Sequence, residues 1–117
     1  MSTWQQFTDL LHARGRALDD LGVSDTALDR EGAEHALCII DDLKEAVLGG
    51  DVYLMKGHSL VSTYDSWHCD RRPDESLPDF AARSIEETRA YVGGYPNGDA
   101  WFTLVLHERP TTDESEI

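Results

Sequence analysis

Apolar residues recur at helical spacing in three stretches of the chain. In residues 3–21 they fall three, four or seven positions apart, which places them on one side of a helix. A second stretch follows Asp29, a good N-cap residue, and runs to about Glu45. A third begins at Asp74 or Ser76, either of which can cap it, and ends at a Gly-Gly pair. The apolar residues expected to face the core are Trp4, Phe7, Leu10, Leu11, Leu18 and Leu21 in the first helix, Ala33, Ala36, Leu37, Ile40 and Leu43 in the second, and Leu77, Phe80, Ile85, Thr88, Tyr91 and Val92 in the third.

Three other stretches carry the patterns of β-strands. Residues 52–55 and 59–69 flank the turn signal Lys56-Gly57-His58 and therefore predict a hairpin. Residues 100–108 predict a last strand with apolar residues on both faces, as in the interior of a sheet. Gly49-Gly50 interrupts the apolar run before the hairpin, and we interpret this pair as a bulge or bend.

The predicted order of elements is α-α-β-β-α-β. We therefore expect an α+β fold with three helices packed on one side of a small antiparallel or mixed sheet. The chain of 117 residues has the size of one domain, which we assign to residues 1–110. Residues 111–117 form an acidic tail that we expect to be mobile.

The location of the protein is predicted from what its patterns lack. No apolar run approaches the roughly 20 residues that cross a bilayer. The first residues lack the basic and apolar regions of a secretory signal. Cys38 and Cys69 do not form a disulfide framework in a domain of this size. We expect a cytoplasmic protein that does not interact with membranes.

The formal net charge of −13 changes the expected partner. Acids outnumber bases in every quarter of the chain, so the negative charge belongs to the folded body as well as to the tail. Nucleic-acid binding requires a basic surface, and the adjacent bases Arg71 and Arg72 stand among acids. The charge is consistent with solubility or with attraction of a basic protein partner.

Two constellations of cysteine and histidine suggest other chemistry. His35 and Cys38 lie three residues apart on one helix face, but of the neighbours His68 and Cys69 one would point away, so we expect no metal site and no cofactor. Cys69 could instead form a nucleophilic pair with His58, His68 or His107. Nearby acids would raise the thiol pKa, whereas Arg71 and Arg72 would lower it, so a small thiol hydrolase stays an alternative.

The hairpin arms place carboxylates beside large aromatic rings. Aspartate is depleted in strands, yet Asp51 precedes Tyr53, Asp65 follows Tyr64, and Trp67 stands close by. The rings could be core residues, which is the commoner fate of aromatics in a small sheet. Tyrosine and tryptophan also anchor protein interfaces, where carboxylates at the rim speed the encounter. The pattern favours a binding protein over an enzyme.

Three blocks of the sequence resemble the immunity protein 40 family of bacterial polymorphic toxin systems. They are Leu48-Gly49-Gly50-Asp51-Val52-Tyr53, Thr63-Tyr64-Asp65-Ser66-Trp67 and Cys69-Asp70-Arg71-Arg72-Pro73-Asp74-Glu75-Ser76. The resemblance extends over about three-quarters of the chain and implies a cytoplasmic antidote without enzymatic activity. Such a protein binds a cognate secreted toxin, often a nuclease or another hydrolase with a basic cleft, and neutralises it by occluding its active site.

The resemblance does not separate contact residues from structural ones. We expect structural roles for Gly49, Gly50, Tyr53 and Tyr64, and contacts with the partner from Asp51, Asp65, Trp67 and Asp70. The oligomeric state is not predicted. A small thiol hydrolase based on Cys69 and an acidic regulatory adaptor stay open as alternatives to an immunity protein.

Overall fold

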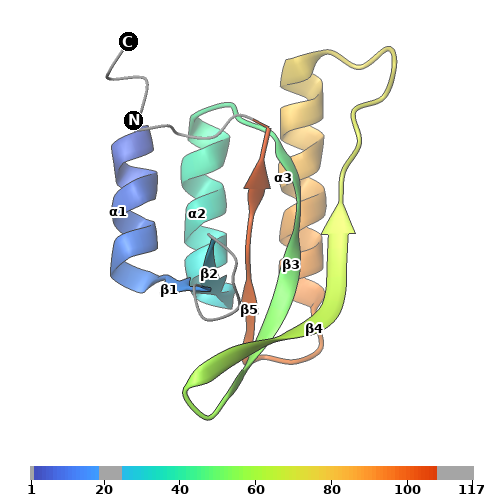
Figure 1. Cartoon of the computed structure of the whole chain (residues 1–117). Helices are drawn as coiled ribbons and strands as arrows, with labels where there is room; N and C mark the ends of the chain where they lie inside the picture. The colour runs from blue at the N-terminus through green and yellow to red at the C-terminus, as the bar shows by residue number, and fades with distance from the viewer. Residues whose placement is uncertain (1, 19–24, 108–117) are drawn as a thin grey trace.

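The computed structural model of the protein describes residues 2–18 and 25–107. In these residues three helices lie on one face of a six-stranded antiparallel sheet (Figure 1), which confirms the predicted α+β class and the relative order of the predicted elements. In chain order the elements are α1 (Trp4–Arg14), β1 (Arg16–Ala17), β2 (Thr26–Asp29), α2 (Arg30–Asp42), β3 (Val47–Lys56), β4 (Ser59–His68), α3 (Leu77–Gly94), β5 (Ala100–Phe102) and β6 (Val105–Leu106). The acidic tail predicted for residues 111–117 lies outside the described residues. No described helix has the length and apolar character needed to cross a membrane.

The long strand β3 is the centre of the sheet, whose strand order is β1-β2-β5-β3-β4. One side of β3 pairs with β4 in the predicted hairpin. Its other side pairs with β5 and, nearer its start, with β6. The predicted last strand over residues 100–108 is therefore two short strands in the structure. Strand β4 is an edge strand of the sheet, and Figure 1 shows that it bends strongly along its length.

The first helix is shorter than predicted. Thr3 and Gln6 form a reciprocal capping box at its start, but it ends at Arg14 instead of residue 21. A side chain at Gly15 would overlap the Leu11 carbonyl oxygen and the Thr26 methyl group. The chain is extended at Gly15 and enters β1. Strands β1 and β2 are too short to show an alternating pattern, so neither was predicted from the sequence.

The other two helices begin as predicted. The Asp29 carboxylate accepts a hydrogen bond from the Gly32 N–H, and Ser76 accepts one from the Asp79 N–H. Helix α2 ends at Asp42, before the expected Glu45. Leu77 was assigned to the apolar stripe of α3, but its side chain is exposed because it lies in the first turn of the helix.

The main core lies between the helices and the sheet, and a second cluster lies on the opposite sheet face. In the main core, Leu37 and Ile40 of α2 and Ile85 of α3 meet Val52 and Phe102 of the sheet. The opposite cluster has as its buried members Leu18, Ala27, Tyr53 and Leu60. Both faces of the hairpin are therefore partly covered. This explains why neighbouring residues of β3, such as Val52 and Tyr53, are both apolar and both buried.

Gly49 and Gly50 allow β4 and the chain between β5 and β6 to lie very close to β3. A Cβ atom at Gly50 would overlap the Thr103 carbonyl oxygen and lie 2.6 Å from Cη2 of Trp67. At Gly49 the φ angle is 145°, and a Cβ atom would overlap the Trp67 carbonyl oxygen. The register of β3 with β6 also shifts between Val47 and Gly49. The lack of a side chain at Gly50 thus leaves room for both the indole of Trp67 and the main chain of Thr103, and the lack of one at Gly49 leaves room for the main chain of Trp67.

We expect the Gly50→Ala substitution to destabilise the fold. The added methyl group meets the main chain of Thr103, which cannot move away as a flexible side chain would, and overpacking of this kind costs about 1–3 kcal/mol or more. Denaturant unfolding followed by circular dichroism measures the loss. Gly98→Ala is the matched control, because nothing lies within 4 Å of a Cβ atom there. Equal stability of the two variants would contradict the close approach at Gly50.

Candidate functional site

Strand β4 contains a bulge opposite the middle of β3. Asp51 pairs with Ser66 and Tyr53 with Ser62, so residues 63–65 lie opposite a single residue of β3. At the middle of the bulge, Tyr64 has a φ angle of 67°, in the left-handed region that few residues other than glycine adopt. Its side chain is 93 % exposed. The bulge therefore lifts one aromatic side chain away from the edge of the sheet.

Hydrogen bonds from side chains replace the missing strand pairing in this bulge. The Thr63 hydroxyl donates to the Val52 carbonyl oxygen over 2.9 Å. The Tyr64 N–H donates to the Ser62 hydroxyl over 3.0 Å, and the Asp65 N–H donates to the Thr63 hydroxyl over 3.1 Å. Short hydroxyl side chains at these positions compete well for backbone groups, so the bulge has a defined conformation.

Next to the bulge, aromatic rings from β4 and α3 pack together. The indole of Trp67 stacks on the ring of Tyr91, with 4.7 Å between centroids, and its N–H donates to the Thr88 hydroxyl over 3.1 Å. Tyr95 follows one turn later, and its ring meets that of Phe102 edge-on at 5.8 Å. Trp67, Tyr91 and Tyr95 are each partly exposed. Their positions are set by the core beneath them, so they form a rigid aromatic surface.

The Asp65 carboxylate is joined to this aromatic surface. It accepts a hydrogen bond from the Tyr95 hydroxyl over 2.6 Å, and this bond raises the pKa of Tyr95. Burial, followed by the charge of Asp65, raises the pKa of Tyr91. We call Tyr64, Asp65, Trp67, Tyr91 and Tyr95 the aromatic–acid site. It joins an exposed carboxylate to three packed aromatic side chains of β4, α3 and the residue that caps α3, and Tyr64 adjoins them in the bulge.

Asp51, which we predicted to contact the partner, lies apart from this site. Its main chain exchanges hydrogen bonds with Thr103, whose hydroxyl accepts from the Asp51 N–H over 3.0 Å. Strand alternation places its carboxylate on the face of Tyr53, away from the helices. Burial and then the charge of Asp51 raise the pKa of Tyr53. Tyr53 is buried there, with 7 % of its surface exposed.

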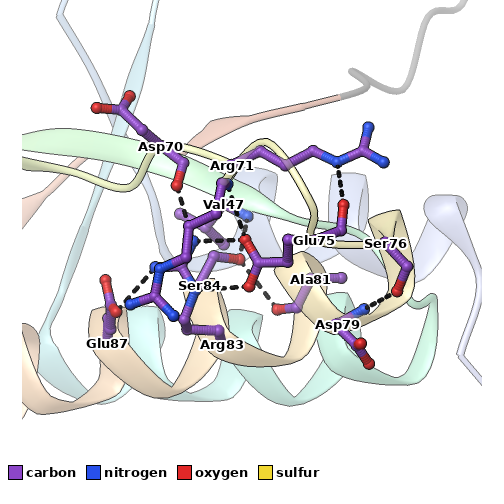
Figure 2. Close-up of polar contacts among 11 residues, drawn as sticks. Val47, Asp70, Arg71, Glu75, Ser76, Asp79, Ala81, Arg83, Ser84 and Glu87 are labelled. Atoms are coloured by element: carbon purple, nitrogen blue, oxygen red, sulfur yellow. Dashed lines mark hydrogen bonds and ion pairs between the residues drawn. The ribbon is translucent and has the colours of Figure 1, made fainter.

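Asp70, the other acid predicted to make contact, lies in the loop between β4 and α3. Figure 2 shows its carboxylate pointing away from the ion pairs beneath it, and 87 % of its side chain is exposed. Its carbonyl oxygen accepts a hydrogen bond from Nη2 of Arg83 over 2.7 Å. The loop therefore presents the Asp70 side chain while α3 holds its main chain.

Glu75 and Arg83 hold this loop on α3. The guanidinium of Arg83 donates to both Glu75 carboxylate oxygens, each over 2.7 Å, and to Glu87 over 3.0 Å (Figure 2). Glu75 also accepts from the Arg72 N–H, and Arg71 donates to its carbonyl oxygen. Arg83 is the main reason that the pKa of Glu75 falls to about 2. Within the block 69–76, the charge of Glu75 is thus compensated by Arg83 of α3, and the main chain of the loop is held on the helix.

A further buried contact joins β3 to the same helix. The hydroxyl of Ser84 accepts a hydrogen bond from the Val47 N–H and donates one to the Ala81 carbonyl oxygen, both over 2.9 Å (Figure 2). Because Ser84 is fully buried, these bonds satisfy groups that water cannot reach. The start of β3 is therefore fixed against the helix that carries Arg83.

Cys69 lies in an apolar environment with 4 % of its surface exposed. Burial is the main cause that raises its pKa to about 11, and Glu87 adds to the effect. A catalytic cysteine needs a lowered pKa, so this environment opposes the nucleophile considered above. His35 and Cys38 are exposed on α2, and the described residues contain no group of three or more His, Cys, Asp or Glu side chains arranged to hold a metal ion.

The structure thus distributes the four predicted contact residues over three places. Asp65 and Trp67 belong to the aromatic–acid site, Asp51 lies on the other sheet face, and Asp70 lies in the loop after β4. Tyr91 and Tyr95 were not predicted as site residues, because Tyr91 fits the apolar stripe of α3 and Tyr95 follows the Gly pair at its end. Their spacing of four residues was the signal that could have placed both rings on one face.

Comparison with protein families matches residues 17–106 to the family described as Immunity protein 40. The match includes α2, α3 and every residue of the aromatic–acid site. It also includes every strand of the described sheet, apart from the first residue of β1. No curated protein and no solved structure matches the chain.

We expect the Glu75→Gln substitution to reduce the loss of folding stability that the protein shows as the pH falls. The pKa of Glu75 is about 2 in the folded protein and ordinarily 4.5, so its charge stabilises the fold above about pH 4.5 and that contribution is lost as the pH falls toward 2. Unfolding measured between pH 7 and pH 2 should show less acid destabilisation for the variant than for the wild type. Glu86→Gln is the control, since Glu86 forms no ion pair with a described residue.

Alkylation distinguishes the two thiols. At neutral pH, Cys69 in the folded protein should react with iodoacetamide about a hundredfold more slowly than in the unfolded chain, because its pKa lies about two units higher. The exposed Cys38 is the internal control and should react readily. Peptide mass spectrometry measures both rates. A Cys69 that reacts faster than a free thiol would restore the thiol hydrolase hypothesis.

Proposed function

The chain belongs to the immunity protein 40 family, and from this membership we propose that it neutralises one cognate secreted toxin by binding over its active site. The toxin we propose is a hydrolase with a basic cleft, such as a nuclease. The protein itself acts by binding and not by catalysis, in the cytoplasm of the cell that makes the toxin. The observation that carries the proposal is an acidic surface whose carboxylates are largely left without cationic partners.

The arginines of the described residues do little to neutralise that surface. Arg14 and Arg83 form ion pairs, whereas Arg16, Arg30 and Arg71 donate to main-chain carbonyl oxygens. The exposed acids without an ion pair to any described residue are Asp9, Glu34, Asp41, Asp42, Asp51, Asp65, Asp74, Asp79, Glu86 and Asp99. A negative potential therefore extends into solvent and would attract a cationic partner.

Within such a surface, the aromatic–acid site offers residues that can contribute most of the binding energy. Trp67, Tyr91 and Tyr95 are partly exposed yet held by packing, so binding would order few side chains. Trp and Tyr are common among residues that dominate the binding energy of interfaces. Asp65 beside them can accept hydrogen bonds from a basic group of the toxin. We assign direct contact to these four residues.

Asp51 and Asp70 have a different place in the proposal. Both are exposed, but neither lies among the aromatic rings. We propose that their charges speed the encounter with the toxin, as rim charges do, and contribute less to the lifetime of the complex. The alternative based on a reactive thiol conflicts with the burial and raised pKa of Cys69.

Co-expression with the toxin encoded by the neighbouring gene tests the proposal. Growth should be restored, and the two purified proteins should associate faster at low salt. The association rate constant should fall at least about tenfold between about 0.01 M and 1 M ionic strength, over which the Debye length shortens from about 30 Å to 3 Å. Stopped-flow or biosensor kinetics measure the association rate constant at each ionic strength.

The Asp65→Asn variant tests whether the toxin contacts the aromatic–acid site. This variant should bind more weakly than the wild type, with a higher dissociation rate constant. Asp9→Asn is the matched control, because it removes the same charge from α1, which packs at the β2 end of the sheet. An association rate that ignores salt, or equal losses in both variants, would contradict contact at the aromatic–acid site.

A further inference from the structure

Tyr64 combines high exposure with an unfavourable backbone conformation. The exposed large hydrophobic side chains of the described residues are Tyr64 at 93 %, Val105 at 44 % and Leu77 at 38 %. Tyr64 also has a φ angle of 67°, where the Cβ atom crowds the main chain. Glycine would adopt this conformation without strain, and asparagine with less strain than tyrosine.

The fold explains the bulge but not the tyrosine. A bulge on β4 keeps this edge of the sheet from pairing with other chains, which is a common protection for edge strands. Glycine at position 64 would serve that purpose better. The ring is not part of any described hydrophobic cluster, and its hydroxyl forms no hydrogen bond with a described residue. Residues strained in this way tend to occur at functional sites.

The base of the side chain is held firmly. Hydrogen bonds of Ser62 and Thr63 hold the main chain on either side of Tyr64, and the Tyr95 hydroxyl holds the following residue, Asp65. The tyrosine ring has few rotatable bonds, so little conformational entropy is lost when a partner encloses it. This arrangement suits a preformed anchor.

We propose that Tyr64 is the anchor of the interface with the toxin and that its ring enters an apolar pocket on the toxin surface. Asp65 follows it at the mouth of the pocket and meets a basic side chain there. This inference rests on the proposed function and gives Tyr64 a contact role in place of the structural role expected from sequence. It predicts that stability and binding make opposite demands on residue 64.

Tyr64→Gly separates these demands. The variant should be at least as stable as the wild type, because the left-handed conformation is no longer strained, and its melting temperature should not fall. Its dissociation constant for the toxin, inactivated at its catalytic residue, should rise at least about thirtyfold, as for an interface hot spot. Differential scanning calorimetry and titration calorimetry measure the two effects.

Three further variants complete the experiment. Tyr64→Phe keeps the ring and should bind within a few-fold of the wild type, whereas Tyr64→Ala should lose binding as Tyr64→Gly does. Leu77→Ala removes another exposed apolar side chain and should leave the dissociation constant unchanged. If the wild type binds and Tyr64→Gly binds equally well, the anchor is overturned and the proposed function stands. A wild type that does not bind the toxin would overturn both.

Discussion

The absence of side chains at Gly49 and Gly50 lets the central strand lie directly against its neighbours. The space beside Gly50 holds the main chain of Thr103 and the indole of Trp67, and the main chain of Trp67 fills the space beside Gly49. Any Cβ atom there would push β4 or the chain between β5 and β6 away from β3. The neighbours on the two hydrogen-bonding sides of β3 therefore both lie against the Gly pair, and this close approach fixes the position of Trp67.

From Trp67 the same constraint reaches α3 and the surface. The indole stacks on Tyr91 and bonds to Thr88, which fixes the last turns of the helix on the sheet. Tyr95 then comes within hydrogen-bonding distance of Asp65 in the bulge. A core feature thus sets the geometry of an exposed carboxylate. The loop before α3 is held separately, by the ion pair of Arg83 with Glu75.

The sequence predicted the long elements of the fold and missed those set by contacts between distant residues. Asp29 and Ser76 were recognised as caps because capping depends on neighbouring residues only. The end of α1 was wrong, since the clash at Gly15 comes partly from Thr26, in a strand too short to predict. Similarly, Asp65 and Trp67 were proposed as site residues, but their association with Tyr91 and Tyr95 requires the packing of β4 on α3. Periodicity carries no information of that kind.

The bulge in β4 shows why position 64 matters beyond the fold. An edge strand needs some irregularity to avoid pairing with other chains, and a bulge with a glycine at its left-handed position supplies it. Natural sequences mostly agree with their fold at each level, and local conflicts tend to be found where function requires them. Within the bulge the conflict is confined to Tyr64, because the hydroxyls of Ser62 and Thr63 support the main chain on both sides. The contact with a partner that we propose would explain both the strain at Tyr64 and the outward position of its ring, whereas protection of the edge accounts for neither.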